Sequence, residues 1–306
     1  ISQVALAVYV ASFLLGMCSA TTNATGMTFF SNVTGASHRG TSMAIFSAAL
    51  LGGQAIGPAA AGLIASVGGW RFAMFVGTAA AGIVGLVLLT AGSSRPSPQN
   101  PVRSGDVGLA DQGSRALLPL LVLQSVSFAV FLTLGSVSQT MVPIIGADDL
   151  GLGTAAIGIA LGVGGLARFV GTLVGGRLSD RLARKYVLVP GLLVQALGVA
   201  LLSLNPTVTL WVTAILIMSL ASFAVPVAAT ILGDITDPAR VGRQLGRFRF
   251  VGDLGLITGP LVVTSLFAGF GRAVAFLFVA GILTTAALVA WRYLPETRGA
   301  HGQGSA

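Results

Sequence analysis

Long apolar stretches alternate with short polar connections along most of the chain. Nine of these stretches are long enough to cross a hydrocarbon core of about 30 Å as helices that rise about 1.5 Å per residue. Helices satisfy their own backbone hydrogen bonds, which lipid cannot do for them. The pattern therefore predicts an all-α polytopic membrane protein with helices at residues 4–29, 41–65, 72–91, 117–144, 154–175, 186–204, 208–232, 243–268 and 273–291.

Residues 92–114 differ from the rest, because they are rich in Ser, Pro, Gly and charged residues and show no apolar periodicity. We interpret them as a cytoplasmic linker between two parts of the fold. Residues 1–91 then hold three helices of a first bundle, residues 115–293 form a six-helix bundle, and residues 294–306 are a cytoplasmic tail.

Positive charge sets the predicted orientation. All but three of the 17 Lys and Arg residues fall on one side of the predicted membrane. The exceptions are Arg71 and Arg272 on the other side and Arg168 inside a helix. Because cytoplasmic loops carry an excess of Lys and Arg, the richer side and the C-terminus are expected in the cytoplasm.

Composition agrees with a lipid environment. The chain is 54% hydrophobic and only 8% charged, whereas soluble proteins are about 25% charged. A net charge of +8 and a pI near 11.2 would also fit a nucleic-acid-binding protein. The cations lie in short loops between apolar runs, however, so no nucleic acid partner is expected. The single cysteine, Cys18, allows no intrachain disulfide, and neither a metal nor a cofactor is expected.

An internal repeat appears when the chain is shifted by 202 residues. Residues 53–58 then align with residues 255–260, which share the pattern Gly-x-x-x-Gly-Pro, and Gly69 aligns with Gly271. Predicted helices one to three thus correspond to seven to nine, while four to six have no partner. Partners would precede Ile1, which we interpret as a cut end. The intact protein is then expected to hold twelve helices in two six-helix halves, an arrangement typical of transporters.

The most specific segment covers residues 176–185, in which four cations surround one acid, Asp180. It resembles the cytoplasmic loop motif of the major facilitator superfamily, and Ala183 stands where the family usually has Gly. The resemblance implies that Asp180 contacts the opposite half, near Thr41, and holds one state of alternating access closed. The plainer alternative is a positive-inside loop without a gating role. The matching residues are Gly176, Leu178, Asp180, Arg181, Arg184 and Lys185.

Three further segments resemble the same family. The first, a helix-packing motif at residues 53–62, resembles a motif prominent in exporters that exchange drugs for protons. Close packing between helices would by itself also explain these glycines. Residues 13–16 resemble the family's R-F-x-x-G segment, but Ser12 replaces the Arg that is tied to proton coupling. Residues 294–299 are similar to the ending that follows the last helix in many members. The helix-packing motif consists of Gly53, Gly57, Pro58 and Gly62.

Polar side chains within predicted helices are candidates for substrate binding or ion coupling, because such groups are costly in lipid. Asp253 is the deepest acid and would carry a proton, bind a substrate amine, or act as a structural partner for a cation in the missing half of the protein. Arg168 would contact an anionic substrate or extend to the cytoplasmic surface. Gln139 and Asn23 would line a central cavity.

These observations predict a secondary active transporter of the bacterial inner membrane, monomeric at full length, that carries a small molecule across the bilayer by alternating access. Efflux of small hydrophobic or drug-like compounds is favoured, with the proton as a candidate coupling ion. The alternative is uptake of a metabolite such as an organic acid or a sugar. An intramembrane enzyme is disfavoured, because the chain has no H-E-x-x-H and no G-x-S-x-G motif. A chain that is inactive on its own is a third possibility.

Overall fold

The computed structural model describes residue 18 and residues 39–90, 114–237 and 240–296. The chain divides into two units, one made of residues 1–53 and 80–106 and the other of residues 54–79 and 107–306. Apart from residue 18, the predicted helix at residues 4–29 lies outside the described residues, as do most of the linker and of the tail.

Regular structure in the described ranges is helical throughout. Five stretches are long and apolar enough to cross a membrane, and α6 is a shorter apolar helix. This confirms the prediction of a polytopic all-α fold, while the number of nine helices stays a prediction. The elements are α2 (Arg39–Thr90), α3 (Ser114–Thr133), η1 (Leu134–Met141), α4 (Val142–Ile144), η2 (Ile145–Asp149), α5 (Thr154–Arg181), α6 (Lys185–Leu201), α7 (Val208–Leu220), η3 (Ala221–Phe223), α8 (Ala224–Ile235) and α9 (Val241–Tyr293).

Two of these helices bend at one glycine each. Gly69 in α2 has φ 77° and ψ 171°, and Gly271 in α9 has φ 84° and ψ 176°. Only glycine adopts this combination of angles readily. Apart from the adjoining backbone, no atom of the described residues lies within 4 Å of where a Cβ would stand at either position, so the backbone angles and not crowding require glycine. The two residues that the sequence repeat aligns therefore share one conformation.

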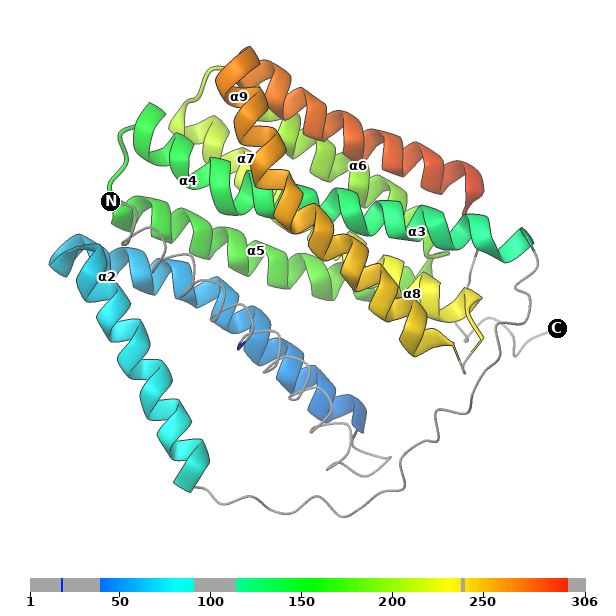
Figure 1. The fold of residues 1–306 in the computed structure, drawn as a ribbon, viewed down its shortest axis with the longest axis horizontal. Helices are drawn as coiled ribbons and strands as arrows, with labels where there is room; N and C mark the ends of the chain where they lie inside the picture. The colour runs from blue at the N-terminus through cyan, green and yellow to red at the C-terminus, as the bar shows by residue number, and fades with distance from the viewer. Residues whose placement is uncertain (1–17, 19–38, 91–113, 238–239, 297–306) are drawn as a thin grey trace. The chain divides into compact units, whose positions relative to one another are not determined.

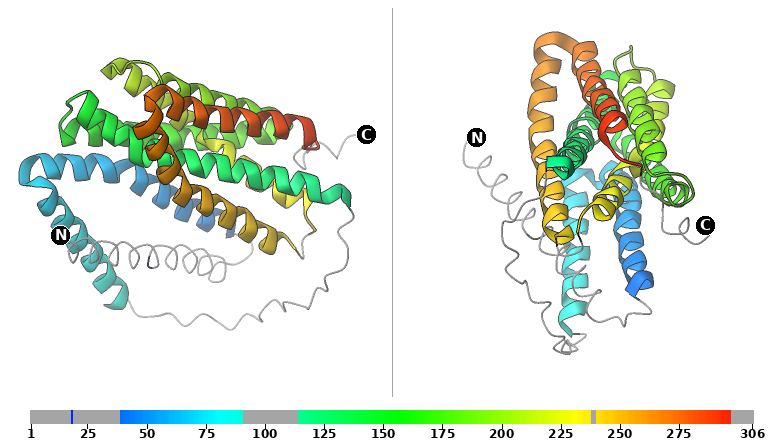
Figure 2. Two further views of the ribbon diagram at one scale, coloured as in Figure 1. Left: turned by 45° about the horizontal axis from the view of Figure 1, so that its top comes forward. Right: turned by 90° about the vertical axis from the view of Figure 1, so that its right-hand side faces the viewer.

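The larger unit has a core formed by α3, α6, α8 and α9. In Figures 1 and 2, α9 turns back at its bend, so that its first half crosses α3 and its second half runs beside α6. Leu123, Leu188, Ile231 and Phe276 from these four helices are fully buried. Large apolar side chains also cover the outside of the bundle, as expected for a surface that contacts lipid.

Glycine brings α3 and α9 close together. A Cβ at Gly259 would lie 2.7 Å from the carbonyl oxygen of Leu132, and a Cβ at Gly255 would collide with the carbonyl oxygen of Phe128. The repeat copy that contains Pro260 thus supplies the face of α9 that packs on α3. Close approach of this kind is how membrane helices gain packing without a hydrophobic driving force between them.

Candidate functional site

The segment at residues 176–185, predicted as a loop, is mostly helical. Gly176 and the residues up to Arg181 form the last turns of α5. Leu182 has an extended backbone, and α6 starts at Lys185. The connection between the two helices is therefore three residues long, and the rest of the motif is held on rigid helix ends. The side chain of Asp180 lies outside what the structure describes.

Arg184 is the buried cation of this motif. It forms an ion pair with Asp234 on α8, and its Nη1 donates a hydrogen bond of 3.1 Å to the carbonyl oxygen of Thr230. The side chain of Arg184 is only 10% exposed, against 33% for Asp234. The motif therefore joins the α5–α6 connection to α8 within the same bundle, a contact that sequence reasoning missed.

The next two residues of the chain reach the end of α9. The Lys185 ammonium lies 5.1 Å from the ring centroid of Trp291, and the Tyr186 ring meets the same Trp edge-on at 5.5 Å. The Tyr186 hydroxyl donates a hydrogen bond of 2.9 Å to Glu296. Aromatic rings beside cations are typical of the interface between lipid and water. We therefore place this end of the bundle at a membrane surface.

Asp253 has a local partner. Nε of Arg249, one helical turn earlier on α9, lies 3.0 Å from its carboxylate, and both side chains are partly exposed. The Arg249 guanidinium also lies 4.6 Å from the ring centroid of Phe131 on α3. The carboxylate is thus neutralised within its own helix, and it remains open on one side.

Arg168 lies between two tightly packed faces of α5. Three residues before it, Gly165 packs against Ala55 of α2, and three residues after it, Gly171 packs against Leu220 of α7. Arg168 is half-buried, and no hydrogen bond or ion pair links it to another residue in the described ranges. A cation in this position favours an anionic partner.

The other two polar candidates are less informative. Gln139 is exposed on η1, a stretch of π-helix, a geometry that is frequent at functional sites. Asn23 lies outside the described residues. No hydrogen bond or ion pair joins Gln139, Arg168 and Asp253 to one another, so the structure does not bring these three described residues into one direct cluster.

An ion pair at the opposite end of the bundle also escaped sequence reasoning. Arg272, directly after the bend of α9, pairs with Asp149 at the end of η2. The sequence contained no signal for the partner of Arg272. The two ion pairs of Arg184 and Arg272 thus connect helices at the two ends of the same bundle.

The helix-packing motif on α2 is only partly in contact with neighbours. A Cβ at Gly62 would lie 2.6 Å from the carbonyl oxygen of Thr154 and 2.8 Å from the Cα of Gly158 on α5. No described atom lies within 4 Å of a Cβ placed at Gly53 or Gly57. Close packing is thus shown at the end of the motif that contains Gly62.

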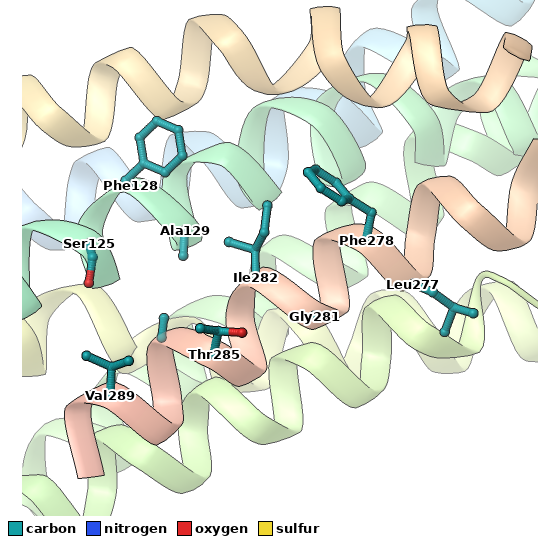
Figure 3. A pocket seen from close by; sticks show the side chains of 10 residues that line it. Ser125, Phe128, Ala129, Leu277, Phe278, Gly281, Ile282, Thr285 and Val289 are labelled. Carbon is teal, nitrogen blue, oxygen red and sulfur yellow. The ribbon is translucent and has the colours of Figure 1, made fainter. Parts of the chain in front are cut away.

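A cavity of about 640 Å³ lies between α3 and the second half of α9. Figure 3 shows Ser125, Phe128 and Ala129 on α3 and the α9 side chains that complete its wall. None of the residues predicted for the functional site lines it. The α9 residues are Leu277, Phe278, Gly281, Ile282, Thr285, Ala286 and Val289.

Long apolar helices, a lipid-facing surface and ion pairs at both ends of the bundle define a multi-pass, all-α membrane protein. The sequence model of the Major Facilitator Superfamily matches residues 1–144 and 125–306. The chain therefore belongs to this superfamily of transporters, and it is not an enzyme.

Individual relatives agree with this assignment. The chain is 26% identical to the class C tetracycline resistance protein of Escherichia coli over 273 residues, which are 85% of this chain and 66% of that protein. It is 28% identical to the inner membrane transport protein YnfM of Escherichia coli K12 over 183 residues, which are 58% of this chain and 42% of that protein. The chain thus spans less than two thirds of either relative.

Among solved structures, the inward-open xylose transporter XylE of E. coli matches with a TM-score of 0.66 and 17% identity. The match covers 90% of this chain and 66% of that chain. At this identity the likeness shows the fold alone.

Proposed function

We propose that this chain works as part of a secondary active transporter that exports small hydrophobic compounds across a bacterial inner membrane by alternating access. The observation that carries the proposal is the alignment with a tetracycline resistance protein over 85% of the chain. The Gly-x-x-x-Gly-Pro segment at residues 53–58, which resembles a motif of drug exporters, supports the same direction of transport.

Alternating access requires bundles that move as rigid bodies. The ion pairs Arg184–Asp234 and Arg272–Asp149 hold helices together at the two ends of one bundle. Both pairs lie within the larger unit, so they stiffen that unit without opposing its movement against other parts of the protein. In this proposal Asp180 supplies the contact that closes one state.

Uptake of an organic acid is the second candidate, and Arg168 favours it. A half-buried cation without an acidic partner in the described ranges is suited to a carboxylate. A hydrophobic, uncharged compound would leave this guanidinium unpaired. The two candidates therefore differ in the charge of the substrate as well as in direction.

The test uses the full-length protein that contains this chain, reconstituted into liposomes with an imposed pH gradient. Export predicts movement of tetracycline or ethidium that depends on the gradient and is absent from liposomes carrying the Asp180→Asn variant. Accumulation of a dicarboxylate such as succinate, without movement of either drug, would replace the first proposal by the second. If none of these probes moved across the liposome membrane, neither drug export nor uptake of an organic acid would be supported.

A further inference from the structure

The cavity between α3 and the second half of α9 opens to the outside of the bundle. Leu277 and Phe278 at one end are exposed, and so is Leu121 one turn before Ser125 on α3. Its wall is apolar apart from Ser125 and Thr285, and the Ser125 hydroxyl donates its hydrogen bond to the carbonyl oxygen of Val122. A groove of this kind offers little to orient a polar compound, whereas it suits a hydrocarbon chain.

The length of the groove matches one leaflet of a bilayer. Its wall on α9 runs from Leu277 to Val289, a distance of about 18 Å at the helical rise of about 1.5 Å per residue. Half of a hydrocarbon core of about 30 Å is roughly 15 Å. An extended acyl chain from one leaflet therefore fills the groove without leaving a polar group inside it.

Cations stand at one end of the groove. Arg292 follows Val289 by three residues, so it lies on the face of α9 that also carries Ile282 and Val289. The Arg292 side chain is exposed, and its guanidinium lies 5.5 Å from the ring centroid of Tyr293. Lys185, on the Trp291 ring, adds a second positive charge at the same helix end. The positive-inside rule assigns this end to the cytoplasmic surface, where anionic lipids are attracted by Lys and Arg.

One acid is close to these cations. Glu296 accepts the hydrogen bond of the Tyr186 hydroxyl, so one of its oxygens is already engaged, and it offsets only part of the positive charge. Among the residues that the structure describes, the helix end keeps an excess of cations beside an apolar groove.

We propose that this groove binds one acyl chain of an anionic phospholipid from the cytoplasmic leaflet, with the lipid phosphate held by Arg292 and Lys185. The lipid lies against the outer surface of α3 and α9 and fills the space between them. This site is separate from the polar residues considered for transport, since none of them lines the groove.

Gly281 allows a direct test, because it lines the groove and, beyond the adjoining helix backbone, no described atom lies within 4 Å of where its Cβ would stand. Gly281→Leu therefore fills the groove without striking the backbone. Gly269 is the matched control, since it also has open space around it on α9 and lies outside the groove. Thr285→Met is a second filling variant, should Gly281→Leu fail to fold.

The full-length protein is titrated with dioleoyl phosphatidylglycerol and with dioleoyl phosphatidylcholine, and bound lipid is counted by native mass spectrometry. We expect the anionic lipid to bind more tightly. Gly281→Leu should weaken its binding more than tenfold, because several methylene groups lose their contact, while Gly269→Leu leaves it unchanged. Arg292→Gln should reduce the preference for the anionic lipid about fivefold, the effect of one cation near an anionic surface.

Three results would overturn the proposal. Equal binding of the two lipids by the unmodified protein would refute a headgroup site. Unchanged binding by both Gly281→Leu and Thr285→Met would refute the groove. Displacement of the lipid by a transported compound such as tetracycline would identify the groove as a substrate site instead. The first two outcomes leave the proposed transport function untouched, because flux is measured separately.

Discussion

Removing the acid from the Arg184–Asp234 pair is the sharpest test of the bundle's cytoplasmic end. Two unit charges about 4 Å apart interact by about 4 kcal/mol at an effective dielectric constant of 20. Breaking a fully buried pair costs about 3–5 kcal/mol, whereas an exposed pair contributes about 1 kcal/mol at most. With Arg184 10% and Asp234 33% exposed, the pair lies between these limits. We expect Asp234→Asn to cost about 2 kcal/mol, because it leaves a buried guanidinium without its counter-charge.

Removing the arginine of the pair should destabilise the protein less than removing the acid. Arg184→Met keeps the apolar part of the side chain and leaves Asp234, which water already reaches. We therefore expect a loss of about 1 kcal/mol, and the double variant should lose little more than Asp234→Asn alone. The assay is a double-mutant cycle on thermal unfolding of the purified full-length protein, in which about 2 kcal/mol corresponds to a fall of about 5 °C in the midpoint.

Two outcomes would refute this reasoning. A coupling energy below about 0.5 kcal/mol would mean that the two side chains act independently. A larger loss for Arg184→Met than for Asp234→Asn would mean that packing of the arginine, and not its charge, holds α8 to the α5–α6 connection.

Three further predictions address transport and packing. Asp180→Asn should abolish transport while the amount of protein in the membrane stays the same, and full transport by this variant would contradict the gating role. Gly255→Val should cost about 2–3 kcal/mol of stability, because its side chain meets the backbone of α3; equal stability loss in the control Gly269→Val would contradict this. Arg168→Gln should raise KM for an anionic substrate about tenfold or more and leave KM for an uncharged one unchanged, in competition assays with both.

The apolar pattern predicted most of the described helices, but it placed the end of a helix too early where charged residues follow the apolar stretch. The predicted helix at residues 154–175 starts with α5 at Thr154, but α5 continues to Arg181. Hydropathy reports the depth of a residue in the membrane and not its backbone conformation, so a helix that emerges into water appears to end early. The same limit made residues 176–181 look like a loop.

The site was harder to predict, because its contacts join residues far apart in the sequence. Arg249 and Asp253 are four residues apart on one helix, a spacing at which opposite charges pair, yet sequence reasoning missed this ion pair. Arg184 and Asp234 come from different helices, and only the packing of α6 against α8 brings them together. The π-helical conformation of η1 was not predicted either, and such turns are rare.

The glycines aligned by the repeat are required for two different reasons. Gly255 and Gly259 allow α9 to pack closely on α3, whereas Gly69 and Gly271 adopt backbone angles that other residues avoid. Substitutions can distinguish these two reasons. At Gly271 the angles φ 84° and ψ 176° lie outside the left-handed helical region that Asn tolerates, in a region that other residues avoid. Gly271→Asn should therefore cost as much as Gly271→Ala, about 1–3 kcal/mol, although space around the residue is open. Gly69 has matching angles, so the same two substitutions there should behave alike.

Thermal unfolding of these four variants tests the argument, with Gly281→Ala as a control in regular helix. If Asn proved much milder than Ala at Gly271, the bend would have to adopt the left-handed helical conformation instead. If the stability losses at Gly69 and Gly271 differed widely, the two bends would not be equivalent. The repeat would then be a similarity in sequence without a matching backbone conformation. Matching losses at both positions would show that the repeat preserves the turn between the last two helices of each copy through backbone conformation, independently of what each copy packs against.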